Sequence, residues 1–309
     1  MKGRLSFVGG VSLDYTKPHK SYRDQLQILT ERGLFIENPA KATRDLKRIG
    51  YYRLSAYTYP FREKQNGPGR ADNFVPGVTF EDAVALCDFD DRLRITLLSG
   101  LQHLEIGLRV QVGYQLGKSG PFSHLDRKLL DATRTKKLKP EYGTNDKADA
   151  YEAWRQRYDA LQIEAKSEDY VKHFILKYDS KIPIWVATEF MTFGNLVALY
   201  DLLTDKDALV IAREYGILNR NILHGWLRAL NILRNQCAHN SRIWNRATVF
   251  PPSKPNGNFL PPGLKHLALA DNTRLYYLAA ILAHLLLAIE PDSRWPSDFK
   301  NNDEEIPLD

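Results

Sequence analysis

Large apolar residues recur every three or four positions along residues 79–117 of the sequence. They are Leu86, Phe89, Leu93, Leu97, Leu101, Leu104 and Leu108. This is the period of an α-helix with one buried face, and Thr79 followed by Asp82 is typical of a helix start. Because no convincing β alternation and no internal repeat are found elsewhere in the chain, the sequence predicts an all-α protein.

Further segments carry helix-boundary residues that divide the chain. Ser21 precedes a helical pattern that Gly33 ends, and Pro39 begins a second helix. Additional helices are expected at 151–166, 167–177 and 272–290, and an exposed loop rich in Gly, Pro and Asn at 64–77. We therefore expect an N-terminal helical extension and loop (1–78), a helical domain (79–290) and a polar tail (291–309).

Composition indicates an ordinary globular protein with a mild preference for anionic partners. The 309 residues suit one large domain or two small ones, and the formal net charge of +6 fits a polyanionic partner without proving one. Only two cysteines, Cys87 and Cys237, are present, which suits a reducing cytoplasm. We expect no signal peptide and no membrane span, because the longest apolar run, 275–289, is too short to cross a bilayer.

The stretch from Leu223 to Arg246 changes character halfway. Its first half repeats large apolar residues at helical spacing, namely Leu223, Trp226, Leu227, Leu230 and Leu233. Its second half gathers cationic and amide side chains, namely Arg234, Asn235, His239, Asn240, Arg242, Asn245 and Arg246. Guanidinium groups bind phosphate, and imidazole exchanges protons near neutral pH. The stretch therefore predicts a half-buried helix leading into a site for phosphate binding and proton transfer.

The spacing of Arg234 and His239 constrains how they can act together. Five positions along an ideal helix correspond to about 140° of rotation and roughly 7.5 Å of rise. The helix must therefore loosen near His239, or a second copy of the chain must complete the site. In a purely structural alternative, Arg234 pairs with an acid on a neighbouring helix, and His239 lies near a helix end where a cation favours the dipole.

Two other groups of residues are candidates for contacting RNA. Tyr51, Tyr52 and Arg53 could stack on nucleobases, although aromatic packing between helices explains them as well. A basic run contains Lys136 and Lys137, which suit an RNA backbone or an ordinary solvated loop. The full set of expected RNA contacts is Tyr51, Tyr52, Arg53, Lys136, Lys137, Arg242 and Arg246.

Two acid–arginine pairs stand four positions apart on the long helix. Asp90 with Arg94, and Glu105 with Arg109, have the spacing at which side chains meet along one helix face. From spacing alone, we expect both to be solvated pairs on the helix surface.

Several separate stretches together resemble the Abi family of bacterial abortive-infection proteins, in particular the AbiD/AbiF-like group. The resemblance spans roughly residues 17–290, and the Arg234-x4-His239 element is similar to the R-x4-6-H signature of HEPN ribonucleases. The stretches that carry it are Tyr51-Tyr52-Arg53-Leu54 with Pro60-Phe61, Phe89-Asp90-Asp91-Arg92-Leu93-Arg94, Glu105-Ile106-Gly107-Leu108-Arg109, Pro183-Ile184-Trp185 with Glu189, Thr192-Phe193-Gly194-Asn195-Leu196, and Arg234-Asn235-Gln236-Cys237-Ala238-His239-Asn240.

This resemblance implies a multi-helix HEPN-like domain that acts on RNA and shuts down a phage-infected cell. It implies Arg234 and His239 as the catalytic pair, with Asn235, Asn240, Glu105 and Arg109 in support. Two copies of the motif meet across a dimer in the HEPN family, so a homodimer is expected, and some relatives work with a small non-coding RNA.

The chemistry expected from Arg234 and His239 is RNA cleavage without a metal or a cofactor, giving 2′,3′-cyclic phosphate ends. Two alternatives remain open: a protein that binds RNA without cutting it, and a structural helical dimer that senses a phage protein.

Overall fold

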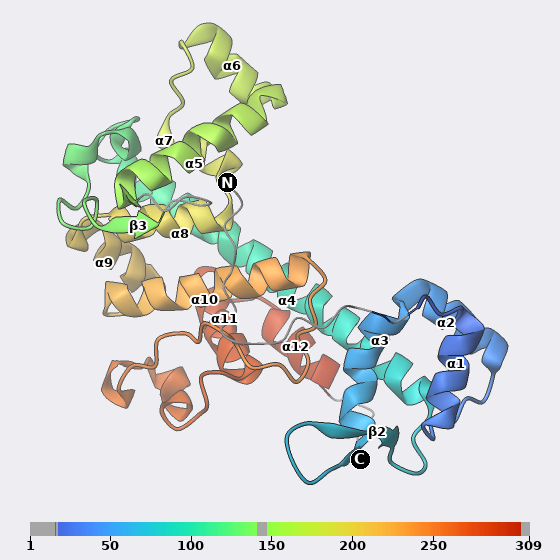
Figure 1. Cartoon of the computed structure of the whole chain (residues 1–309). Helices are drawn as coiled ribbons and strands as arrows, with labels where there is room; N and C mark the ends of the chain where they lie inside the picture. Colours follow the sequence, from blue (N-terminus) through green and yellow to red (C-terminus); the bar gives the residue numbers. More distant parts are fainter. Residues whose placement is uncertain (1–15, 17, 141–146, 304–309) are drawn as a thin grey trace. The chain divides into compact units, whose positions relative to one another are not determined.

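The computed structural model describes residues 16, 18–140 and 147–303, and its helices confirm the all-α class (Figure 1). The described residues form two compact units, one ending at Asp88 and the other beginning at Phe89. The boundary falls inside helix α4 (Phe80–Gly117). The domain division expected after residue 78 stays a prediction.

The first unit is a small helical cluster with its own apolar core. Ser21 and Asp24 form a reciprocal capping box at the start of α1, and the Asn38 side chain caps α2, which begins with Pro39 as expected. Its elements up to α4 are α1 (Tyr22–Glu31), α2 (Pro39–Ile49), α3 (Tyr51–Thr58), the 3-10 turn η1 (Tyr59–Phe61), β1 (Arg62–Lys64) and β2 (Arg70–Phe74). Its core contains Leu26, Leu29, Leu34, Leu46, Leu54, Phe74 and Phe80.

The loop expected at 64–77 is wrong over Arg70–Phe74, because these residues form the second strand of a β-hairpin, although most of the stretch is exposed. Strands β1 and β2 pair antiparallel, with Arg62 opposite Phe74 and Lys64 opposite Arg70. The turn between the two strands contains Gly67, Pro68 and Gly69. Phe74 is buried in the core of the first unit, and it is the only large apolar residue in β2. A two-stranded hairpin with one buried position leaves almost no alternation to detect.

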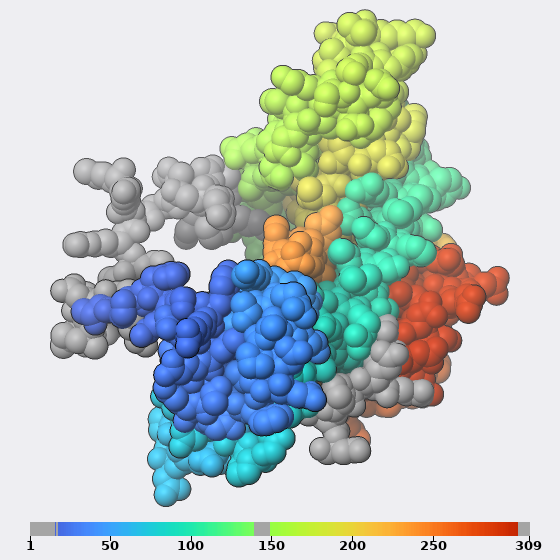
Figure 2. Space-filling model, turned by 90° about the vertical axis from the view of Figure 1, so that its right-hand side faces the viewer, coloured from blue at the N-terminus to red at the C-terminus, as the bar shows by residue number. Residues whose placement is uncertain are grey.

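The second unit is built around α4 and α10 (Arg220–Ala238). Helix α10 packs against α8, α9 and α11 (Figure 1), while α5 and α6 form a projecting lobe (Figure 2, yellow-green). The remaining helices are α5 (Ala150–Glu164), α6 (Asp169–Lys177), α7 (Ile184–Phe190), α8 (Phe193–Leu202), α9 (Asp205–Glu214), α11 (Leu275–Ile289) and α12 (Trp295–Asp303). A second small hairpin consists of β3 (Leu138–Pro140) and β4 (Lys147–Asp149).

The predicted apolar face of α10 is confirmed, since the residues that define it are all buried: Leu223, Trp226, Leu227, Leu230 and Leu233. Part of the expected polar tail is instead the helix α12. Its first residue, Trp295, is buried, and its indole nitrogen donates to the carbonyl oxygen of Thr96 at 2.7 Å. One buried tryptophan thus anchors an otherwise polar segment. Within 16, 18–140 and 147–303, no helix combines the length and the apolar character needed to cross a membrane.

The expected surface pair of Asp90 and Arg94 does form, but it is buried. Asp90 is 0 % exposed, and its carboxylate accepts a hydrogen bond from Arg94 Nη1 at 2.6 Å. It also accepts the backbone N–H groups of Ile243 at 3.1 Å and Trp244 at 2.7 Å. The pair is therefore a connection between α4 and the segment that follows α10, which spacing within one helix cannot indicate.

We predict that Asp90→Ala lowers the free energy of unfolding by about 3–5 kcal/mol, the usual cost of breaking a buried ion pair. The substitution leaves two backbone N–H groups without their acceptor. Asp159→Ala is a matched control, because Asp159 also pairs with an arginine four residues away but both side chains are partly exposed. The control should cost less than about 1 kcal/mol. Urea denaturation measures both, and equal losses would contradict the role of burial.

Candidate functional site

Helix α10 ends at Ala238, one residue before His239. The backbone N–H of Asn240 bonds to the Cys237 carbonyl at 3.1 Å, and that of Ser241 bonds to the Gln236 carbonyl at 2.9 Å. This paired pattern is a Schellman motif, with Asn240 in the left-handed conformation at φ +53°. His239 is the C-cap, its φ and ψ of −93° and 17° lie outside the helical range, and its side chain is exposed. The loosening expected near His239 is therefore present.

Arg234 lies one turn earlier and faces a buried carboxylate on α4. Its Nε is 3.5 Å from Glu105 Oε2, a distance that makes an ion pair, although the N–H is not directed well enough for a hydrogen bond. Glu105 Oε1 accepts a hydrogen bond from Arg109 Nη2 at 2.8 Å. One carboxylate therefore holds two guanidinium groups. The Arg234 side chain remains 32 % exposed, so its outer nitrogens can still meet a ligand.

The expectation that Glu105 and Arg109 form a solvated surface pair is wrong, because Glu105 is 5 % exposed. Arg109 also donates to the Met191 carbonyl at 3.2 Å and lies 3.6 Å from the Glu189 carboxylate. These contacts join α4 to the end of α7. Glu189 was part of the sequence pattern that carries the family resemblance, but spacing along one helix could not place it beside Arg109.

Arg234 and His239 lie on different faces of α10. Within the described part of the chain, no hydrogen bond or ion pair joins their side chains. Arg234 Nη1 instead lies 3.4 Å from Asn235 Oδ1, so the guanidinium reaches toward the neighbouring face of the helix. This geometry matches the structural alternative, because Arg234 pairs with an acid on another helix and His239 lies at a helix end.

The residues that follow His239 differ in burial near the end of α10. Asn240 borders a cavity of about 230 Å³ that Arg94 and Cys237 also line. Burial raises the pKa of the Cys237 thiol to about 12, so it stays protonated. Arg242 is partly buried and Arg246 is exposed. Across 16, 18–140 and 147–303 there is no group of three His, Cys, Asp or Glu side chains that could hold a metal ion.

The tyrosine cluster belongs to the first unit. Tyr51 packs against the core of that unit, as the aromatic-packing alternative expected, and Arg53 is partly buried. Tyr52 differs, because it is 91 % exposed. Of the three residues, only Tyr52 presents most of its ring to a stacking partner.

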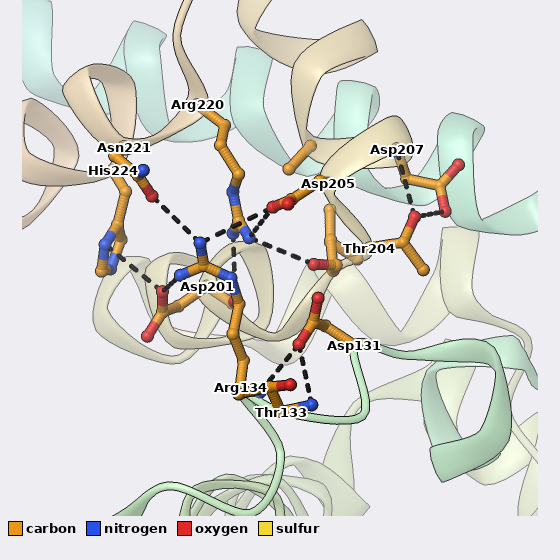
Figure 3. A network of polar contacts seen from close by, with 12 residues as sticks. Asp131, Thr133, Arg134, Asp201, Thr204, Asp205, Asp207, Arg220, Asn221 and His224 are labelled. Atoms are coloured by element: carbon orange, nitrogen blue, oxygen red, sulfur yellow. Dashed lines mark hydrogen bonds and ion pairs between the residues drawn. The ribbon is translucent and has the colours of Figure 1, made fainter.

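The two lysines of the basic run differ in setting. Both side chains are exposed, but Lys137 also lines a cavity of about 670 Å³ beside α8 and α10. Residues that sequence reasoning did not single out share this cavity, including Arg134, Asp201, His224 and Arg228. Figure 3 shows Arg134 and His224 meeting the carboxylate of Asp201. The sequence contains a signal for part of this site, since His224, Arg228, Asn231 and Asn235 follow helical spacing on one face of α10.

Comparison with known proteins gives one match: a family model described as Abi-like protein matches residues 44–245. The matched stretch includes Glu105, Arg109, Arg234 and His239. No curated protein and no solved structure matches the chain.

We predict that Glu105→Gln destabilises the protein by about 1–3 kcal/mol, because it weakens charge-assisted contacts to two arginines at a buried position. Glu189→Gln is the matched control: Glu189 also contacts Arg109, but its side chain is 56 % exposed. Its loss should be below about 1 kcal/mol. Thermal and urea unfolding of the two variants give the comparison, and a control as damaging as Glu105→Gln would refute the structural importance of the buried carboxylate.

Proposed function

The chain belongs to the Abi-like protein family, and from this premise we propose that it is an RNA-cutting enzyme of a bacterial phage-defence system. The family indicates a role in abortive infection. The finer proposal is that the protein cleaves RNA in the cytoplasm and thereby arrests the infected cell.

The observation that carries the proposal is the setting of the two motif residues. The Arg234 guanidinium is held by a buried carboxylate yet keeps an exposed tip, and the His239 imidazole is exposed at the end of the same helix. A held guanidinium is preorganised to stabilise charge on a phosphate. An exposed imidazole can reach a substrate and transfer protons as a general acid or base.

In the proposed reaction, the ribose 2′-oxygen attacks the adjacent phosphorus. The O2′–P bond forms, the P–O5′ bond breaks, and Arg234 stabilises the charge on the phosphoryl oxygens. His239 takes the proton from the 2′-hydroxyl or delivers one to the departing 5′-oxygen. The products carry a 2′,3′-cyclic phosphate and a free 5′-hydroxyl. DNA lacks the attacking hydroxyl and should survive.

The separation of Arg234 and His239 on α10 gives the reason for proposing a homodimer. Their positions differ by about 140° around an ideal helix, so one chain presents them in different directions. A two-fold pairing in which the Arg234 of one copy meets the His239 of the other would bring both groups to one phosphate. Such pairing would form two equivalent sites for each dimer.

A second candidate function is the binding of RNA, such as a small non-coding partner, without cleavage. The contact of Arg234 with Glu105 favours it, because the carboxylate already neutralises part of the arginine's charge. Cleavage assays separate the two functions.

We predict that Arg234→Ala and His239→Ala each lower the rate of RNA cleavage by about a hundredfold or more. Exposed residues of the same types, Arg213 and His173, provide the controls Arg213→Ala and His173→Ala, which should keep most activity. Cleavage of a labelled RNA, with analysis of the product ends, makes the measurement. A requirement for magnesium, or equal cutting of DNA, would refute the proposed chemistry.

We also predict that the two inactive variants restore each other. Arg234→Ala and His239→Ala chains carrying different tags are co-expressed and purified through both tags. If each site takes one residue from each copy, one of the two sites is intact, and about half of the wild-type activity should return.

The reciprocal pair is the control for this complementation. A double variant lacking both residues, paired with a wild-type chain, should be inactive, because each shared site then lacks one group. Activity in this pair, with none in the first, would place both residues of a site in one chain. Failure of the tagged chains to co-purify would exclude the dimer.

A further inference from the structure

A buried arginine, Arg220, fixes the end of α8 beside the cavity of about 670 Å³. Arg220 is 5 % exposed, and its guanidinium donates to the carbonyl oxygens of Tyr200 at 2.8 Å, Asp201 at 3.0 Å and Leu203 at 3.3 Å. It also pairs with Asp205 at 3.2 Å. These four contacts hold the end of α8 and the turn into α9 in one conformation, so the backbone that carries Asp201 is fixed before any ligand arrives.

Asp201 lines the cavity and positions two of its other lining side chains (Figure 3). Its carboxylate accepts a hydrogen bond from Arg134 Nη1 at 3.2 Å and lies 3.4 Å from His224 Nδ1. Arg134 Nη2 also donates to the Asn221 side chain at 3.1 Å. These contacts bring the Arg134 guanidinium and the His224 imidazole together on one carboxylate at the cavity.

The charges around the cavity are not balanced. Arg134 and Arg220 are matched by the carboxylates of Asp201 and Asp205. Lys137 and Arg228 also line the cavity and are exposed, and no side-chain hydrogen bond or ion pair is found for either within the described ranges of the chain. The cavity therefore has two surplus positive charges, which favour an anionic ligand.

The remaining lining fits a nucleotide better than a free phosphate ion. Val197, Ala198 and Ile232 give an apolar wall, while Asn221 and Asn231 supply amide groups. A volume of about 670 Å³ lies in the range of small-molecule sites and exceeds what one phosphate fills. An apolar wall beside cationic and amide groups matches a base and sugar joined to phosphate. An unpaired nucleotide can enter such a concave site, whereas a base held in a duplex cannot.

One face of α10 leads from this cavity to the motif histidine. Its residues follow one another at intervals of three or four positions and are exposed or partly exposed: Asn221, His224, Arg228, Asn231, Asn235 and His239. His224 and His239 are fifteen residues apart, which corresponds to about 22 Å along a helix. At about 3.4 Å for each stacked nucleotide of one strand, this length matches roughly six nucleotides.

We propose that the cavity walled by Lys137, His224 and Arg228 is a subsite that binds one nucleotide of single-stranded RNA lying along this face of α10. The inference rests on the proposed function, since it takes RNA as the ligand, and it adds where the strand is anchored. Lys137 and Arg228 contact the phosphates, the amides of Asn221 and Asn231 bind the sugar or base edge, and His239 lies at the far end of the strand.

The test uses the full-length protein and 2′-O-methyl oligoribonucleotides of 3–12 residues, which cannot be cleaved because the attacking hydroxyl is blocked. The test variant is Lys137→Gln/Arg228→Gln. Its control is Lys166→Gln/Arg213→Gln, which removes the same charges at exposed positions outside the cavity. Fluorescence anisotropy at several salt concentrations gives the affinity and its salt dependence.

We expect the test variant to bind the longer oligonucleotides about tenfold or more weakly and to reduce the slope of log affinity against log salt by about 1.4, the loss of two phosphate contacts. The control should change affinity less than about twofold. The wild-type affinity should rise with length up to about six nucleotides, and the test variant should lose part of that gain.

Four other outcomes would overturn the subsite, the catalytic proposal or both. Equal weakening in both double variants would overturn the subsite and leave only general charge attraction. Unchanged binding by the test variant would also overturn the subsite, while RNA as the ligand would stand. Wild-type protein without affinity for any of the oligonucleotides would overturn both proposals. If the wild-type protein binds as expected but never cuts unmodified RNA, the subsite stands and the catalytic proposal fails.

Discussion

The need to pair buried carboxylates on α4 determines where the motif segment lies. A buried ionised acid is costly unless cations or N–H groups compensate it. Glu105 meets Arg234 within α10, and Asp90 meets the backbone of Ile243 and Trp244 just beyond it. The segment between these two attachments contains His239. The exposed end of α10 is thus fixed on both sides by charge pairing to a single long helix.

Much of the fold was predictable because its helices carry local signals. The apolar face of α10 and the capping residue Ser21 are patterns within one segment, and the structure confirms them. The hairpin formed by β1 and β2 was missed, since its turn residues resemble a loop and only Phe74 is buried. Helix α12 was missed for a similar reason, because one buried tryptophan carries its packing in an otherwise polar segment.

The candidate site was predictable in its residue types but not in its contacts. Arg234 and His239 stand out by composition, whereas the burial of Glu105 depends on α7 and α10, which are distant in sequence. The cavity that contains Lys137 was missed for the same reason. The lining residues Asp201 and His224 come from different helices and carry no shared motif, so only the fold brings them together.

Helix α10 lines a cavity near its start and has the exposed imidazole of His239 at its end. An RNA strand anchored in the cavity would reach the imidazole after a number of nucleotides that the length of the helix between them determines. The length of the helix would then set the distance between the anchored nucleotide and the cleaved bond. The cleavage position would depend on the number of helical turns as well as on the bases beside that bond. Inserting one helical turn between the cavity and the imidazole would move that position without altering either group.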